Sequence, residues 1–217
     1  MRYAMWFRIG LLLLAGALPA FAAEKAPTRA QALKSLEQAS PAVRRAAVQR
    51  LGEVGTMADA DRLVARLHDE DDRVRLFATD SMWRIWSRSG DRAIDALYLR
   101  GLEQMEASRV EEAVATFSEI IRRKPSFAEA WNKRATIYFL MGEFERSMKD
   151  CDEVLKRNSL HFGALSGYAQ MYLQMGDFEN ALLYFERALK INPNLPGAAT
   201  TIPLLQQQLQ EKRRKTI

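Results

Sequence analysis

Apolar and small residues recur along the second half of the chain with a period of 34 residues. The recurring columns are Leu97, Trp131 and Leu165; Gly101, Ala135 and Ala169; Phe117, Cys151 and Phe185; and Ile120, Val154 and Ala188. A fixed period of this size is typical of a repeat array, whose units are too small to bury their apolar faces alone and stack on their neighbours. Three copies of the unit are present.

Each copy is expected to hold two helices joined by a tight turn. The phrase YFLMGEFERSMKDCDEVL at 138–155 returns as YLQMGDFENALLYFERAL at 172–189. Gly142 and Gly176 stand just past the first helix, where a left-handed backbone is often needed and costs glycine little. The repeated phrase therefore describes architecture.

A shorter period of 31 residues relates two segments nearer the amino terminus. SPAVRRAAVQRLGEVG at 40–55 is echoed by DDRVRLFATDSMWRIW at 71–86. Between them, Leu63, Val64 and Leu67 have the spacing of an amphipathic helix. Helices are therefore predicted on both sides of the change in period, which indicates an all-α fold.

The two repeat types meet without a spacer. Residues 91–106 fall where the second 31-residue unit needs its second helix and where the first 34-residue unit needs its first. No stretch rich in Pro, Gly or Ser separates Gly90 from Gly101, as a flexible linker would. One helix is therefore expected to serve both repeat types, and the body of the chain to form one curved solenoid.

The 34-residue columns resemble the tetratricopeptide repeat, a helix-turn-helix unit marked by a small residue, a Tyr, then Ala, Phe and a closing Pro. AWNKRATIYFLMG and ALLYFERALKINP carry nearly every element of that pattern. The first copy departs from it, with Gln104 at the usual Tyr and Ser108 at the turn Gly.

The 31-residue unit resembles the HEAT-like repeat found in bilin lyases, whose mark is an acidic turn followed by Val-Arg and a small-residue helix. Asp69 stands at the position where that pattern has an acidic residue, whereas Gln38 occupies the matching position in the first copy. Together the two resemblances imply a right-handed α-solenoid of helix-turn-helix repeats, HEAT-like and then tetratricopeptide.

The amino terminus has a different character. Arg2 and Arg8 precede the apolar run IGLLLLAGAL and small residues that end at Ala22. This is the pattern of a secretory signal peptide. The apolar run is about half of the roughly 20 residues that a spanning helix needs, so an uncleaved anchor is the less favoured alternative. We expect an exported mature chain from Ala23, periplasmic in a Gram-negative bacterium, without stable membrane insertion.

The expected organisation has four parts. They are a signal peptide (1–22), HEAT-like repeats (23–93), three tetratricopeptide repeats (94–195), and a capping helix with a basic tail (196–217). Loss of the leader reduces the net charge from +5 to +3, because Arg2 and Arg8 are removed. So mild a charge does not indicate a nucleic-acid partner, which needs clustered Lys and Arg. The tail EKRRK is interpreted as solvated, with contact to an anionic membrane or a partner as the alternative.

Candidate chemistry is sparse. The single Cys151 and the two histidines, His68 and His161, lack the spacing of a zinc site. Cys151 belongs to an apolar column and is expected to be a buried small hydrophobe. The turn DEDD lacks the Gly and distal Glu of a calcium loop. Trp83 and Trp86 are expected to pack in the core or between modules rather than stack on a ligand. No enzyme activity, metal or cofactor is therefore predicted.

The tetratricopeptide resemblance implies that a protein or peptide partner binds on the concave face, which the first helix of each repeat forms. The positions that it assigns to partner binding are Tyr98, Asn132, Thr136, Phe139, Ser166, Gln170 and Leu173. The Lys and Arg clamp of chaperone-binding members is not matched. Tyr98, Leu102, Gly163 and Gly167 stand at the clamp positions, so a carboxyl-terminal partner is not expected.

The favoured interpretation is a non-enzymatic, exported interaction module or scaffold, whose partner the sequence does not identify. The alternative, prompted by the HEAT-like resemblance, is an enzyme-accessory or lyase-like protein that binds a small ligand through the HEAT-like part.

Overall fold

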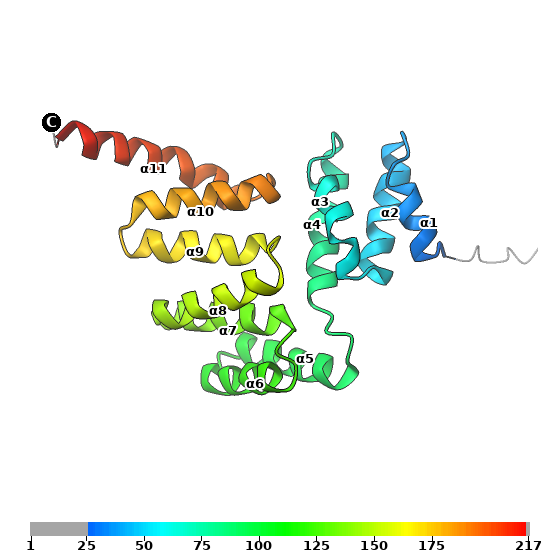
Figure 1. The fold of residues 1–217 in the computed structure, drawn as a ribbon, viewed down its shortest axis with the longest axis horizontal. Helices are drawn as coiled ribbons and strands as arrows, with labels where there is room; N and C mark the ends of the chain where they lie inside the picture. Colours follow the sequence, from blue (N-terminus) through cyan, green and yellow to red (C-terminus); the bar gives the residue numbers. More distant parts are fainter. Residues whose placement is uncertain (1–25, 216–217) are drawn as a thin grey trace, which may run out of the picture.

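The computed structural model describes residues 26–215, so the predicted signal peptide lies outside the described residues. Within that range the chain is all helical, with no strand, which confirms the predicted fold class (Figure 1). The elements are α1 (Arg29–Ser35), α2 (Pro41–Val54), the 3-10 turn η1 (Met57–Asp59), α3 (Ala60–Leu67), α4 (Asp72–Trp86), α5 (Arg92–Glu106), α6 (Val110–Arg123), α7 (Ala128–Leu140), α8 (Phe144–Arg157), α9 (Phe162–Gln174), α10 (Phe178–Ile191) and α11 (Pro196–Lys215). None of these helices is long and apolar enough to cross a membrane.

Helices α1–α4 form the N-terminal module, two helical hairpins that stack through α2 and α4. A Cβ on Gly52 would lie 2.6 Å from Ser81 Oγ, so glycine permits the close crossing of these two helices. Ser81 Oγ then donates a hydrogen bond of 2.9 Å to the Val48 carbonyl across the crossing. The stacked hairpins bury a continuous apolar core, which contains Leu51 and Met82.

The two hairpins of the N-terminal module are equivalent in their hydrogen bonding. Arg44 and Arg75, which stand 31 residues apart, each donate to two carbonyl groups in the turn that precedes their own helix. The acceptors are Gln38 and Ala39 for the first arginine and Asp69 and Glu70 for the second. Arg44 also forms a buried bidentate ion pair with Asp69, at 2.7 and 2.9 Å. The acidic turn is therefore structural, while its identity as a HEAT-like turn stays a prediction.

Helices α5–α11 form the repeat array, in which α5–α6, α7–α8 and α9–α10 are successive helical hairpins and α11 packs on α10. Its three turns share a left-handed residue, with φ of 55° at Ser108, 75° at Gly142 and 74° at Gly176. The first copy thus adopts the turn of the other two although it lacks the glycine. The predicted solenoid of helix-turn-helix repeats is confirmed.

Helix α5 belongs to the repeat array alone, and the prediction that it serves both repeat types is wrong. Its buried residues Ile94 and Tyr98 share a core with α6 and α7, and α5 contributes nothing to the core of the N-terminal module. Gly90, at a φ of 78°, stands in the turn between α4 and α5, where the chain changes direction. Asp91 then caps α5 through its side chain.

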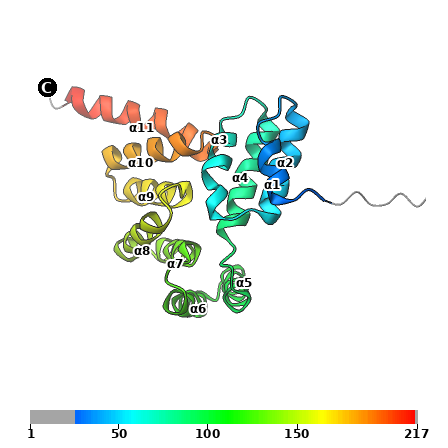
Figure 2. The same cartoon turned by 45° about the vertical axis from the view of Figure 1, so that its right-hand side comes forward.

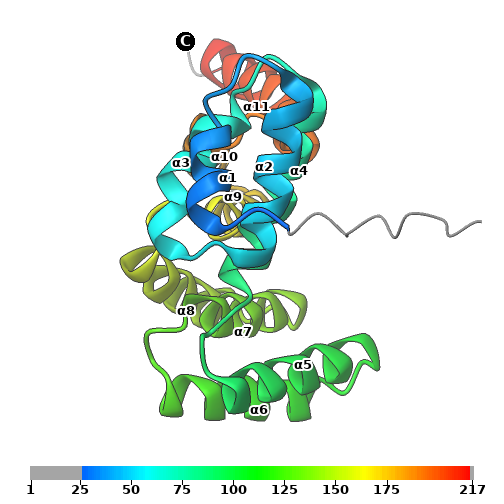
Figure 3. The same cartoon turned by 90° about the vertical axis from the view of Figure 1, so that its right-hand side faces the viewer.

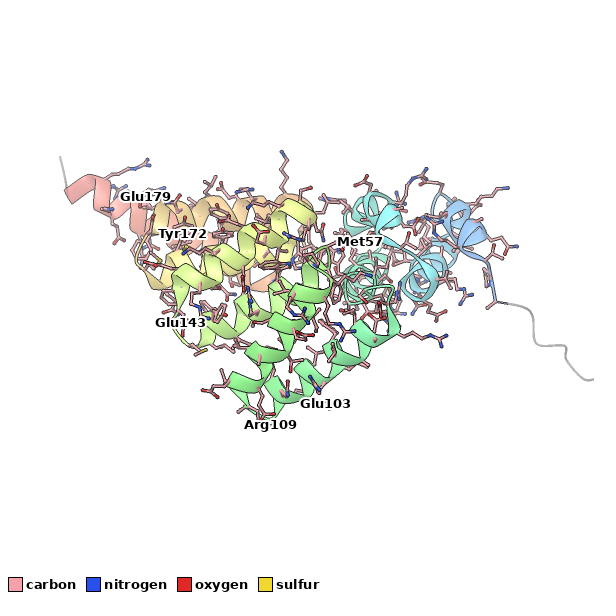
Figure 4. All side chains as sticks on the ribbon, turned by 60° about the horizontal axis from the view of Figure 1, so that its bottom comes forward. Met57, Glu103, Arg109, Glu143, Tyr172 and Glu179 are labelled. Carbon is pink, nitrogen blue, oxygen red and sulfur yellow. The ribbon has the colours of Figure 1, made fainter. Side chains whose placement is uncertain are left out.

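The N-terminal module packs instead against the edge of the array that carries the turns between repeats, as Figures 2 and 3 show. Phe162, at the start of α9, enters the core of the module. Asn194, in the turn before α11, donates to the Leu67 carbonyl at 2.8 Å and accepts from Arg75 at 3.0 Å. In Figure 4, Met57 lies at this boundary. The turns within repeats lie along the opposite edge.

Candidate functional site

The first helices of the second and third repeats enclose a small hollow. It has a volume of about 140 Å³ and lies between α7 and α9. Five predicted partner-binding residues meet in its wall: Asn132, Thr136, Phe139, Ser166 and Gln170. The structure therefore brings together side chains that are up to 38 positions apart in the sequence.

A larger hollow of about 490 Å³ continues from the first one toward α11. The two share Gly163, Ser166 and Gln170 of α9, and the larger one adds the predicted residue Leu173. We call the two hollows together the concave groove. Six of the seven predicted residues line it.

Tyr98 is the exception, because the structure does not bring it to the groove. Its side chain is 3% exposed and packs edge to face on Phe117 and Phe127, with ring centres 5.9 and 5.5 Å apart. Its hydroxyl donates to the buried Glu129 at 3.4 Å. In the terminal repeat this position faces the helix pair behind it, so repeat spacing alone misplaced Tyr98.

The groove offers hydrogen-bonding groups but no charge. Within the described part of the chain, none of the residues that line either hollow is acidic or basic. Thr136 donates to the Asn132 carbonyl of its own helix. Ser166 and Gln170 have side chains without a hydrogen-bond partner among residues 26–215, so their amide and hydroxyl groups are available to a ligand.

One wall of the larger hollow comes from the N-terminal module. Trp83 of α4 lines it and packs edge to face on Phe162 at 5.3 Å. A Cβ on Gly163 would lie 2.5 Å from Trp83 Cη2, so glycine admits the ring. The sequence predicted packing for Trp83 and missed its place in the site. The repeat pattern carries no signal for a residue that another module supplies.

A buried polar cluster lies behind the groove. The Glu129 carboxylate accepts hydrogen bonds from His161 Nε2 at 2.9 Å and Asn132 Nδ2 at 3.2 Å, and pairs with Lys133 at 3.1 Å. His161 Nδ1 accepts from the Ala164 amide at 3.0 Å, which places the ring proton on Nε2. Burial opposes ionisation of Glu129, but the hydrogen bond from His161 and the positive charge of Lys133 hold the pKa of the carboxyl below its usual range.

This cluster also joins the two parts of the molecule. The ring of Trp86, from α4, stacks on His161 with 4.4 Å between ring centres. Lys133 Nζ lies 5.9 Å from the centre of the Trp83 ring. Side chains of the N-terminal module and of the array are therefore in direct contact behind the groove.

The floor of the smaller hollow contains Cys151, which is 2% exposed, as its apolar column predicted. Burial, reinforced by the charges of Asp150 and Asp152, raises the pKa of the thiol to about 12. A thiol with such a pKa remains protonated at neutral pH. Among the described residues, no group of three His, Cys, Asp or Glu side chains has the geometry of a metal site.

Another hollow, larger than either of these two, is lined by residues of α1 and α2. It measures about 550 Å³ and has a mainly apolar wall that includes Ala42, Val43 and Ala46. Its charged residues Arg50 and Glu53 pair with each other at 2.6 Å. It contains none of the predicted site residues, and nothing in its wall favours a particular ligand.

Comparison with known proteins identifies the repeat array. The tetratricopeptide repeat family matches residues 98–155 and 164–195. A tetratricopeptide repeat-containing protein of Rhizobium etli is 33% identical over 93 residues, which are 42% of this chain and 46% of that protein. The match thus spans about half the length of the relative.

Solved structures agree on the fold. The first tetratricopeptide domain of Spaghetti (RPAP3), bound to the HSP90 peptide SRMEEVD, has a TM-score of 0.51 at 22% identity and covers 54% of this chain and 92% of that one. The first tetratricopeptide domain of human RPAP3 has a TM-score of 0.52 at 21% identity, and the match covers 56% of this chain and 95% of that one. The tetratricopeptide domain of Sgt2 from Aspergillus fumigatus has a TM-score of 0.53 at 17% identity, and the match covers 57% of this chain and 83% of that one.

Proposed function

Residues 98–155 and 164–195 are tetratricopeptide repeats, and on this basis we propose that the chain is a non-enzymatic interaction module whose concave groove holds an extended segment of a partner protein. The observation that carries the proposal is the meeting of Ser166 and Gln170, both without internal partners, in a continuous groove of two hollows. Amide and hydroxyl groups placed in this way bind the backbone of an extended peptide.

The chemistry of the groove favours an uncharged partner segment. The related Spaghetti domain binds a peptide with acidic residues near its end. Here Gly163 and Gly167 stand at clamp positions and no cation lines the groove within residues 26–215. A carboxylate would lose its hydration without gaining a counter-ion, which is costly. An apolar side chain, in contrast, gains by entering the larger hollow against Trp83 and Leu173.

We also propose that this module acts outside the cytoplasm, as a scaffold for another envelope protein. The support is the charged, apolar and small-residue pattern that ends at Ala22. The intact mass of the protein purified from its native host tests the proposal. A mass that corresponds to a chain beginning at Ala23 supports export, and a mass that includes Arg2 contradicts it.

Capture of partners by crosslinking in native envelopes tests the binding function. Gln170→Ala removes one exposed groove amide, and Gln170→Glu introduces a charge into the uncharged wall. We expect weaker capture with the first variant and loss of capture with the second, at an unchanged melting temperature. Gln208→Ala, an exposed glutamine of α11 outside the groove, is the matched control. If Gln170→Ala and Gln170→Glu both capture the same partners as the native chain and the control, the groove is not the binding site.

A further inference from the structure

A separate hollow of about 200 Å³ lies at the junction of the N-terminal module and the repeat array. Trp86 and Arg88 line it from the module, and Lys124, Arg157 and Asn158 line it from the array. It shares no lining residue with the concave groove. Met57, which also borders it, marks its position in Figure 4. We call it the junction hollow.

Two buried hydrogen-bond donors of the junction hollow have no partner. Trp86 is 4% exposed and Asn158 is 5% exposed. Neither Trp86 Nε1 nor Asn158 Nδ2 has a hydrogen-bond acceptor within the described residues. Folded proteins keep very few buried donors in this state, because each loses its hydration and gains nothing in return. Both residues line the same hollow, which points to an acceptor that binds there.

The charge of the junction hollow has one sign. Arg88, Lys124 and Arg157 line it, and no acidic side chain does so within the described part of the chain. Lys124 forms no ion pair with a described carboxylate. Arg88 donates to the carbonyls of Gly52 and Gly55 rather than to an acid.

Nearby groups offset this charge only in part. Burial, together with the positive charge of Arg84, lowers the pKa of Arg88, and the negative charge of Asp95 opposes this lowering only as the weakest cause. Arg157 pairs with Glu153 at 2.6 Å, which neutralises one of the three cations. The pKa of Asp91 is lowered mainly by hydrogen bonds from the Ile94 and Ala93 amides at the start of α5. The positive charge of Lys124 contributes less to this lowering.

The first turn of α7 supplies the same polarity. This helix begins at Ala128 with no side-chain cap, and both Phe127 and Ala128 line the junction hollow. The Glu129 carboxylate belongs to the same turn, but it bonds to His161 and does not line the hollow. The unpaired amide groups and the positive end of the helix dipole favour a bound anion at such a terminus.

We propose that the junction hollow binds a small oxyanion, a phosphate group, through Lys124 and Arg157 and the donors Trp86 Nε1 and Asn158 Nδ2. The volume accommodates a phosphate or a small phosphorylated molecule. The bound anion contacts both the N-terminal module and the array, so its binding stabilises their docking. This inference does not depend on a partner in the concave groove.

Thermal unfolding of the mature chain in sodium phosphate, against sodium chloride of matched ionic strength at pH 7.5, tests the site. We expect a saturable rise in melting temperature with phosphate alone. Asn158→Asp keeps the oxygen that accepts from the Leu160 amide and replaces the unpartnered donor by a carboxylate oxygen. We expect it, like Lys124→Gln, to raise the half-saturating phosphate concentration at least about tenfold, equivalent to ~1.4 kcal/mol.

Lys149→Gln removes the same charge from an exposed site on α8 and is expected to leave the phosphate response unchanged. A sodium acetate series distinguishes the source of the oxyanion. Saturation by acetate at lower concentration than by phosphate, with the same dependence on Asn158, overturns phosphate in favour of a carboxylate. An equal rise in chloride, or an equal phosphate response in Asn158→Asp and the native chain, shows that no oxyanion site exists.

Discussion

Single residues carry strain and charge that the repeat pattern does not show. Ser108 holds a φ of 55°, in a turn that Gly142 and Gly176 make in the other copies. A side chain in this left-handed region is crowded against the backbone, and glycine is not. The repeat architecture, in which α5 and α6 pack along each other, imposes the conformation in spite of the residue.

Ser108→Gly is therefore expected to stabilise the chain by about 0.5–1 kcal/mol, after the greater flexibility of glycine in the unfolded state is deducted. Urea unfolding of residues 23–217, with and without the substitution, measures the change. Gly142→Ala, the reverse change in the second copy, is expected to destabilise. A lower stability of Ser108→Gly would contradict the strain assigned to this turn.

The Glu129 carboxylate makes stability depend on pH. Its pKa is lowered in the folded chain, so its contribution is present above the unfolded pKa and is lost as the pH falls through the folded value. Glu129→Gln is expected to lower the free energy of unfolding at pH 7 by about 2 kcal/mol. The difference from the native chain is expected to narrow below about pH 4. Denaturant unfolding from pH 3 to 8 measures both chains, and a constant difference would contradict the ionised state of Glu129.

At the scale of elements, helix α9 connects the repeat array to the N-terminal module. Gly163 and Gly167 lie on the same side of this helix and differ in their surroundings. A Cβ on Gly163 meets Trp83 at 2.5 Å, whereas one on Gly167 meets only Cys151 Sγ at 3.8 Å. The two glycines therefore offer a matched pair of substitutions.

Gly163→Ala is expected to displace the Trp83 ring and to destabilise the chain by about 1–3 kcal/mol, as overpacking does. Gly167→Ala is expected to stabilise it by up to about 1 kcal/mol, because alanine favours the helix and meets no clash. Thermal unfolding together with Trp fluorescence measures both effects. Equal effects of the two substitutions would contradict the docking of Trp83 on α9.

The sequence predicted most of the array because its packing is local. The columns of small and apolar residues reflect contacts between adjacent helices, and those contacts recur with the repeat. The docking of α4 on α9 joins Trp83 to Gly163 across 80 positions, and no periodicity encodes it. The expectation that α5 packs on both the N-terminal module and the array was wrong for the same reason, because the periodicity does not show where the module docks. Six groove residues were found because they share the repeat, and Tyr98 was misplaced because it lies in the terminal one.

At the scale of the whole molecule, the N-terminal module contacts the turn between α10 and α11, which is distant in the sequence. Thr79 and Asn192 are 113 positions apart and lie within hydrogen-bonding distance, and Asn194 bonds to the Leu67 carbonyl. The N-terminal module thus covers the edge of the array that holds Phe162 and His161.

A fragment of residues 91–217 is therefore expected to melt several degrees below a chain of residues 23–217, because removal of the module exposes Phe162 and His161 to water. Circular dichroism at 222 nm measures both, and the intact chain is expected to unfold in a single transition. If the fragment melts at the temperature of the intact chain, the docking contributes nothing to stability.

The central claim is that the concave groove receives the partner, and site-specific photo-crosslinking tests it most directly. A photoreactive amino acid replaces Gln170, whose side chain is exposed in the groove, or Leu183, which is 48% exposed on α10 and lines neither hollow. Irradiation in native cells is expected to yield a discrete adduct from position 170 and none from position 183. Adducts from position 183, with none from position 170, would contradict the claim.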